Sequence, residues 1–190
     1  MYNLRRIMLG NLRALFSVIG DIALLRRGPD SLPASTALLL VVIAVHAVVS
    51  AIMTLTLSDP PASWPLPILA GTALTLWCFD IGLRIAGKRE RFTQTMTAWF
   101  SMSALFLPAL APIVVTLESY IAKPESGSAA PYALYLLFML LVGWLVVVMV
   151  RIIRAAFDWN YLISTIFFLG FQFGGYVILT LLFGVAAKPA

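Results

Sequence analysis

The chain has 190 residues, of which 62% are hydrophobic and 11% charged, and its formal net charge is +5. Soluble domains average about 45–50% apolar and about 25% charged residues, so this composition excludes an ordinary soluble enzyme, a disordered chain and a nucleic-acid-binding protein. A single cysteine, Cys78, excludes an internal disulfide. The single histidine cannot hold a metal ion without further ligands, so no metal or other cofactor is expected.

Residues 1–35 form a segment that precedes the first long apolar run. Between positions 2 and 27, apolar residues recur every three or four positions, which predicts one or two amphipathic helices. Arg13 and Asp21 interrupt this stretch and no small-residue cleavage site follows, which argues against a signal peptide. Two placements are open: the helix packs against the ends of the spans, or it lies among the headgroups with its arginines toward anionic lipid (Arg5, Arg6, Arg13, Arg26, Arg27).

Five apolar stretches follow, each long enough to cross a hydrocarbon layer about 30 Å thick as an α-helix. They cover residues 36–57, 66–86, 96–117, 132–153 and 161–187, within a membrane domain predicted over 36–190. Their residues do not alternate between apolar and polar as outer-membrane strands do, and backbone groups in lipid must be bonded within the segment. We therefore predict an all-α bundle of five transmembrane helices with an amphipathic helix before it.

The positive charges indicate an orientation in the membrane. Eleven of the thirteen Lys and Arg residues lie before the first span or at the second and fourth turns, whereas Lys123 and Lys188 lie on the other side. Cytoplasmic loops carry such an excess, which predicts a cytoplasmic N-terminus and a periplasmic C-terminus. Short loops favour a bacterial inner membrane.

Ionisable residues inside the spans are candidates for function because they are costly in lipid. His46 lies near the middle of the first span, and Asp80 lies near the cytoplasmic end of the second. If the two helices are neighbours, this pair could relay a proton. Alternatively, Asp80 is neutralised by Arg84, four residues along the same helix, and His46 is bonded to a neighbouring helix. The third span also contains Pro108 and Pro112, which favour a bend.

The fifth span contains a second group of candidates. Gly170 and Gly174 form a pair of small residues at the spacing that allows another helix to approach closely, and Gln172 lies between them. The amide of Gln172 is expected to form a hydrogen bond across that contact. The contact is made either with a partner or second copy, or within the same bundle. The glycines also favour a hinge.

Tryptophans indicate where the spans meet the headgroups, since this residue is enriched at membrane interfaces. Trp64, Trp99 and Trp159 lie near predicted span ends and are expected to be interfacial anchors. Trp77 and Trp144 lie deeper and are expected to pack within the bundle.

Catalytic motifs are not found in the sequence. It has no Ser–His–Asp arrangement, no His-Glu-x-x-His, no Cys-x-x-Cys, no phosphate-binding loop and no pair of intramembrane aspartates. Charged side chains at the headgroup level provide only Glu90 and Asp158 as possible bases. We therefore predict that the chain is not an enzyme.

Three stretches resemble the Ypt-interacting-protein (Yip) family of membrane proteins, in its short bacterial branch. They are LLRRGPDSLPAS (24–35), GKRERFTQTMTAWFSMSALFLPALAPIV (87–114) and RIIRAAFDWNYLISTIFFLGF (151–171). The resemblance covers about residues 30–190 and implies a cytoplasmic N-terminal segment, five closely spaced spans and no catalytic residues. Eukaryotic members of that family organise vesicle traffic through partner proteins.

The sequence favours a non-catalytic inner-membrane protein that acts as a scaffold or accessory subunit. Its expected partners are the phospholipid bilayer and other membrane proteins or a second copy of itself, with no nucleic acid. The residues expected to form contacts are Gly170, Gln172 and Gly174. The alternative function is a small transporter or channel subunit that uses His46, Asp80 and Gln172.

Overall fold

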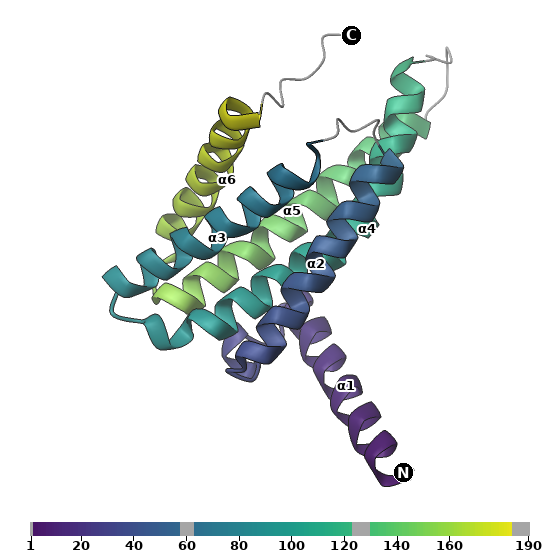
Figure 1. The fold of residues 1–190 in the computed structure, drawn as a ribbon. Helices are drawn as coiled ribbons and strands as arrows, with labels where there is room; N and C mark the ends of the chain where they lie inside the picture. The colour runs from purple at the N-terminus through teal and green to yellow at the C-terminus, as the bar shows by residue number, and fades with distance from the viewer. Residues whose placement is uncertain (1, 58–62, 123–129, 184–190) are drawn as a thin grey trace.

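A computed structural model describes the backbone of residues 2–57, 63–122 and 130–183, and the side chains of residues 13–56, 63–120 and 131–183. Within these ranges the chain forms helices and no strand (Figure 1). The α-helices are α1 (Tyr2–Ala23), α2 (Thr36–Leu57), α3 (Pro65–Ile85), α4 (Phe92–Ala122), α5 (Ala130–Phe157) and α6 (Tyr161–Phe183). Two 3-10 turns, η1 (Pro29–Ser31) and η2 (Arg89–Arg91), precede α2 and α4.

Five of these helices, α2 to α6, are long and apolar enough to cross a membrane, which confirms the predicted all-α bundle with five spans. The 31 residues of α4 and the 28 of α5 make these helices longer than predicted. At 1.5 Å per residue they measure about 46 Å and about 42 Å, so both extend beyond a hydrocarbon layer about 30 Å thick. Helix α6 is described as far as Phe183, so positions 184–187 of the predicted span lie outside the described residues.

Helix α1 is a single helix that runs away from the bundle, and only its last turns pack against it (Figure 1). Ile22 and Ala23 are buried in the common core, and Leu15, Val18 and Ile19 lie against it. The C-terminal part of this amphipathic helix therefore packs against the spans. Arg13, Arg26 and Arg27 are exposed, and Arg27 pairs with Asp21 at 3.1 Å, while the side chains of Arg5 and Arg6 lie outside the described residues.

The end of α1 is fixed by donors from α5 that bond to one carbonyl at the end of the helix and one just after it. Trp144 Nε1 donates to the carbonyl of Ala23 at 2.8 Å, and Arg151 donates to the carbonyl of Leu25. Carbonyls at a helix end have no partner within the helix, so these side chains supply the missing bonds. Leu25 itself has a positive φ of 61° and ends α1 in the manner that glycine usually does. The sequence predicted that Trp144 packs within the bundle, but its side chain is 41% exposed and its indole N–H serves as the donor to α1.

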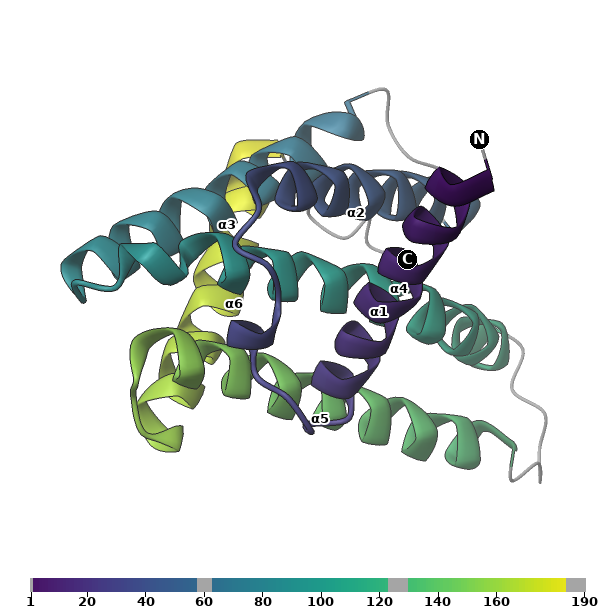
Figure 2. The same ribbon diagram turned by 90° about the horizontal axis from the view of Figure 1, so that it is seen from below.

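The connection between α1 and α2 crosses α4 and α5 and is held there (Figure 2). Gln94 Nε2 on α4 donates to the carbonyl of Leu32 at 2.7 Å and to that of Asp30 at 3.2 Å. The Leu32 side chain is 2% exposed and belongs to the core. Turn η1 is thus part of the packed structure and closes one end of the bundle.

The buried core lies at this same end of the bundle. Most of its members come from the first half of α4 and the second half of α5, with Phe79 and Leu83 from the end of α3. Toward the opposite end, few residues of the described chain are buried. The bundle is therefore packed tightly where α1, η1, α4 and α5 meet, and it is loosely packed at the other end.

Phe79 is the centre of an aromatic cluster that joins α3, α4, α5 and α6. Its ring is fully buried and lies 5.0 Å from Trp99, 6.1 Å from Phe157 and 5.8 Å from Phe171, measured between ring centroids. Trp99 is 5% exposed, so the prediction that it is an interfacial anchor is wrong. The Trp99 ring lies against aromatic rings of α3 and α6, so it is stabilised by packing and not by the interface.

A further sequence-based expectation, that Trp77 packs inside the bundle, is corrected by the structure, whereas the bend expected at Pro108 and Pro112 stays a prediction. Trp77 is 62% exposed on α3, so it faces outward and does not pack inside the bundle. Helix α4 continues without interruption through Pro108 and Pro112. The hydroxyl of Thr116 donates to the carbonyl of Pro112 at 2.7 Å. Several other hydroxyls in the spans bond in the same way to the carbonyl four residues before them.

The bond from Trp144 to α1 leads to a test. We expect Trp144→Phe to leave the Ala23 carbonyl without its partner, at a cost of about 1–3 kcal/mol. Amide hydrogen exchange in the last turn of α1 then accelerates by about tenfold or more, whereas exchange in α4 stays unchanged. The measurement is hydrogen–deuterium exchange by mass spectrometry in a mild detergent.

Trp77→Phe is the matched control, because it removes the same indole N–H from a span where that group forms no hydrogen bond in the described chain. Equal acceleration in both variants would show that the Trp144 bond does not hold α1.

Candidate functional site

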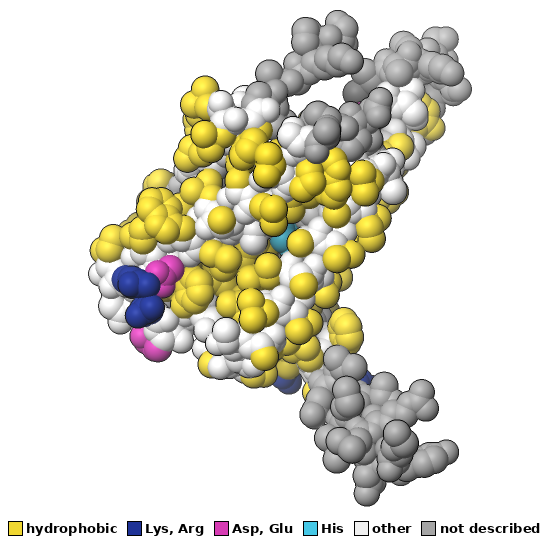
Figure 3. All heavy atoms as spheres, in the orientation of Figure 1, with side chains coloured by type: hydrophobic (Ala, Val, Ile, Leu, Met, Phe, Trp, Pro, Cys, Tyr) yellow, Lys and Arg dark blue, Asp and Glu magenta, His cyan; other side chains and the backbone are white. Residues whose placement is uncertain are grey.

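Charged side chains gather at the tightly packed end of the bundle, while much of the visible flank is hydrophobic (Figure 3). The connection from α3 to α4 and the connection from α5 to α6 meet there, covered by η1. We refer to this region as the charged end, defined by Asp80, Arg84, Lys88, Arg89, Arg91, Arg151, Arg154 and Asp158.

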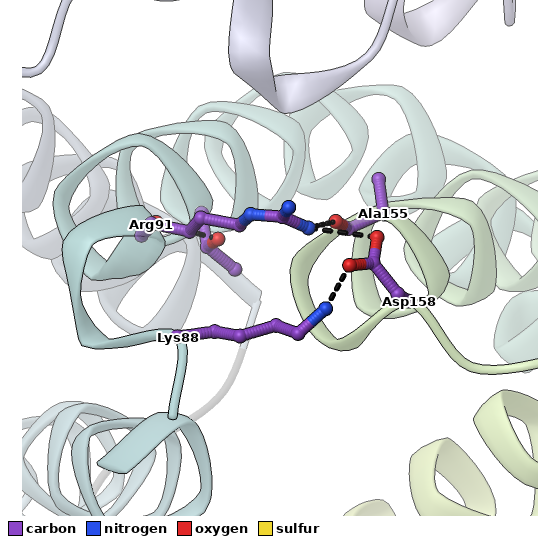
Figure 4. A network of polar contacts seen from close by, with 5 residues as sticks. Lys88, Arg91, Ala155 and Asp158 are labelled. Carbon is purple, nitrogen blue, oxygen red and sulfur yellow. Dashed lines mark hydrogen bonds and ion pairs between the residues drawn. The ribbon is translucent and has the colours of Figure 1, made fainter. Parts of the chain in front are cut away.

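The Asp158 carboxylate joins the two connections (Figure 4). Arg91 Nη1 lies 2.8 Å from Asp158 Oδ1, and Lys88 Nζ pairs with the other oxygen, Oδ2. The same Arg91 nitrogen donates to the carbonyl of Ala155 at 2.8 Å, in the last turn of α5. One carboxylate thus holds two cations that lie about 70 residues away in the sequence.

Local backbone geometry positions these three side chains. Asp158 follows the last residue of α5 and has a positive φ of 56°, which reverses the chain after the helix. On the opposite side, Gly87 has a φ of 67°, and the N–H of Lys88 bonds to the carbonyl of Leu83 at 2.8 Å. This hydrogen bond closes α3 in a Schellman turn, for which glycine is suited because it has no Cβ.

A second ion-pair group lies beside the first. Asp80 Oδ2 is 2.6 Å from Arg84 Nη2, one turn along α3, and Asp80 Oδ1 is 3.5 Å from Arg89 Nε in η2. The Asp80–Arg84 pair is the one that the four-residue spacing indicated. Asp80 therefore links the end of α3 to the start of the next connection.

Two adjoining cavities open at the charged end between η1 and the ends of α4 and α5. The first, of about 360 Å³, is lined by Pro29, Asp30, Arg91, Gln94, Thr95, Ala155, Ala156 and Asp158. The second, of about 420 Å³, is lined by Gly28, Asp30, Arg151, Arg154, Ala155, Asp158 and Trp159. A separate apolar groove of about 460 Å³ lies between α3 and α6, lined by Ala70, Ala73, Leu74, Trp77, Ile178, Leu179 and Leu182.

The structure does not bring the predicted intramembrane pair together. His46 lies against Phe100 of α4, with 5.1 Å between ring centroids, and its Nδ1 has no hydrogen-bond partner in the described chain. Asp80 is engaged by Arg84 and Arg89. The arrangement corresponds to the interpretation in which Asp80 is neutralised on its own helix, although His46 has a packing contact where a hydrogen bond was expected.

The candidates on α6 are found on its less covered surface. A Cβ atom added at Gly170 or Gly174 would meet no other atom within 4 Å, and the Gln172 side chain is exposed. At 3.6 residues per turn, Gln172 lies roughly half a turn from both glycines. A single helix that packs on the two glycines would therefore not reach the Gln172 amide.

Sequence reasoning identified the basic and acidic residues of the charged end, but not their arrangement. Lys88, Arg91 and Asp158 were noted only as side chains at headgroup level, and Gln94 was not singled out. Lysine and arginine beside a span usually indicate its orientation, so their presence alone does not predict which carboxylate they pair with. A contact across 70 residues has no signature in one sequence.

In comparisons with known proteins, no protein-family model, no curated protein and no solved structure matches the chain. In the part of the chain that the structure describes, no group of three His, Cys, Asp or Glu side chains is placed to hold a metal ion. The charged end can therefore bind through its arginine and lysine donors and can accept through Asp30 and Asp158.

The Asp158 ion pairs can be tested by removing the charge alone. We expect Asp158→Asn to lower the unfolding temperature by about 2–4 °C, because partly exposed pairs contribute about 1 kcal/mol and the chain is of this size. Asparagine tolerates the positive φ at this position, so the backbone is preserved. The measurement is thermal unfolding in detergent followed by tryptophan fluorescence.

Glu90→Gln is the control, since Glu90 is exposed in η2 and forms no ion pair among the described residues. If Glu90→Gln destabilises the protein as much as Asp158→Asn does, net charge and not the ion pairs accounts for the effect.

Proposed function

We propose that this chain is a non-catalytic membrane-protein subunit that binds another membrane protein, or a second copy of itself, through α6. The five apolar helices establish a membrane protein. The proposal concerns what those helices do there, and the observation that carries it is the uncovered surface of α6.

Helix α6 is the least covered of the five spans. Its buried residues, Ser164 and Phe168, both lie in its first half, and no residue between 171 and 183 is buried. Gly170, Gly174 and Gly175 lie in open space at the middle of this helix. Small residues let two helix backbones approach closely in lipid, where helix packing depends on close contact between surfaces.

Gln172 supports the same proposal from another side of α6. Its amide is exposed in the middle of a 23-residue apolar helix and forms no hydrogen bond within the described chain. An amide in hydrocarbon without a partner costs several kcal/mol, so a neighbouring polar group or backbone would stabilise it. A partner on this side of α6 can provide that group.

The orientation in the membrane is inferred from the distribution of Lys and Arg along the chain. We assign the charged end to the cytoplasm and the opposite end to the periplasm of a bacterial inner membrane, because cytoplasmic ends carry the excess of Lys and Arg. A role in assembly also agrees with the resemblance to the Yip family, which brings no catalytic residues.

The close approach at α6 can be tested without disturbing the fold. Gly174→Leu has space for its side chain in the isolated chain, so we expect normal folding but loss of the complex. The association constant should fall by about tenfold or more, which corresponds to roughly 1.4 kcal/mol. Differently tagged copies and mass spectrometry of co-purified proteins measure self-association and partner binding in one preparation.

Gly143→Leu on α5 is the matched control, because a side chain there also meets no atom within 4 Å. Elution of the wild-type chain alone as a monomer, or equal loss of the complex in both variants, would contradict the proposal.

The alternative, a transporter or channel subunit, is less well supported. His46 lies against Phe100 and Asp80 pairs with Arg84, and neither they nor Gln172 line any of the three cavities above. We expect the wild-type chain in proteoliposomes to carry no proton flux above that of empty vesicles. A wild-type flux that His46→Ala or Asp80→Asn abolishes, with the variant still folded, would favour the transporter.

A further inference from the structure

The surroundings of the second cavity at the charged end carry more positive than negative charge. Asp158, on its wall, is already shared between Lys88 and Arg91. Arg151 and Arg154 also line the cavity, and neither pairs with a carboxylate in the described chain. The cavity wall thus holds two arginines and the carboxylates of Asp30 and Asp158. Because Lys88 and Arg91 neutralise Asp158 from outside this wall, positive charge exceeds negative charge around the cavity.

Both unpaired arginines are held in place by neutral groups. Arg151 donates to the carbonyl of Leu25. Arg154 Nη1 lies 3.3 Å from the hydroxyl of Tyr161, and its guanidinium carbon lies 4.4 Å from the centroid of the same ring. A guanidinium has five N–H donors, so each arginine keeps donors for a ligand after these contacts. Because the arginine side chains are already positioned, binding of a ligand would cost little of their conformational entropy.

We propose that Arg151 and Arg154 bind the phosphate of an anionic phospholipid in this cavity. The planar arginine fork matches two oxygens of a phosphate, and two forks side by side favour a headgroup without a compensating cation. The proposal concerns the charged end and does not depend on the role assigned to α6.

The position of the cavity favours a lipid over free phosphate. It lies at the ends of α4 and α5, which extend beyond the hydrocarbon layer, so it is at the depth of the headgroups. Trp159 on its wall stacks on Phe157 with 4.3 Å between centroids, which gives the cavity an aromatic side suited to the interface. Basic pockets of this kind between membrane helices recognise anionic headgroups.

The test uses the full chain in a mild detergent with added phosphatidylglycerol, or phosphatidylcholine of the same acyl chains, and counts bound lipid by native mass spectrometry. We expect tighter binding of phosphatidylglycerol by about tenfold, and a loss of about tenfold in Arg154→Gln, because charge-assisted hydrogen bonds are lost. Arg89→Gln removes an arginine from the same end but outside both cavities, and it should bind as the wild type does.

Three results would overturn the proposal. The first is equal binding of the two lipids, and the second is an equal loss in Arg154→Gln and Arg89→Gln, which would indicate general surface charge. The third is displacement of the lipid by inorganic phosphate at a similar concentration, which would assign the site to free phosphate. Retention of the lipid in the presence of excess phosphate supports the proposal.

Further variants allow the same test if Arg154→Gln does not fold in detergent. Tyr161→Phe keeps the ring beneath Arg154 and removes the hydroxyl that helps to position it, so lipid binding should weaken, but less than in Arg154→Gln. Arg154→Lys keeps the charge but not the planar fork, so binding of phosphatidylglycerol should fall. Wild-type affinity in Arg154→Lys would contradict the role given to the guanidinium.

Discussion

The ion pairs of Asp158 with Lys88 and Arg91 form the junction around which the elements of the charged end are arranged. They connect the chain between α3 and α4 to the chain between α5 and α6, so four spans are joined at one level. The aromatic cluster around Phe79 packs directly beside this junction and includes residues of the same four helices. Polar and aromatic contacts therefore reinforce each other at one end, where Asp158 also forms a wall of both cavities.

The difference in packing between the two ends of the bundle is explained by the lipid that surrounds the helices. Between helices in lipid, apolar side chains gain little by contact with each other in place of acyl chains, so association depends on close packing and hydrogen bonds. At the charged end, ion pairs, stacked rings and the donors of Gln94, Trp144 and Arg151 provide such contacts. Farther along, α6 has exposed apolar side chains and glycines with open space around them, and nothing in the described chain holds it as firmly.

The sequence predicted the helical class, the five spans and the Asp80–Arg84 pair, because these depend on composition, length and spacing within one helix. The junction was not predictable in this way, since Lys88 and Asp158 are 70 residues apart and Trp144 and Ala23 are 121 apart. Which helices are neighbours decides those contacts, and hydrophobic runs of similar length do not specify it. For the same reason Trp99 and Trp77 had their expected positions reversed: one lies against the Phe79 ring and the other faces outward.

The attachment of α1 also shapes the space that the protein occupies in a bilayer. The helix is tied to α5 through Ala23 and Leu25 and then runs away from the bundle (Figure 1). If its amphipathic length lies among the headgroups, one of the two placements that the sequence left open, it occupies area only in the leaflet at the charged end. The molecule is then wider in one leaflet than in the other, and a wedge of this kind is accommodated with less strain where the bilayer curves away from its wide side.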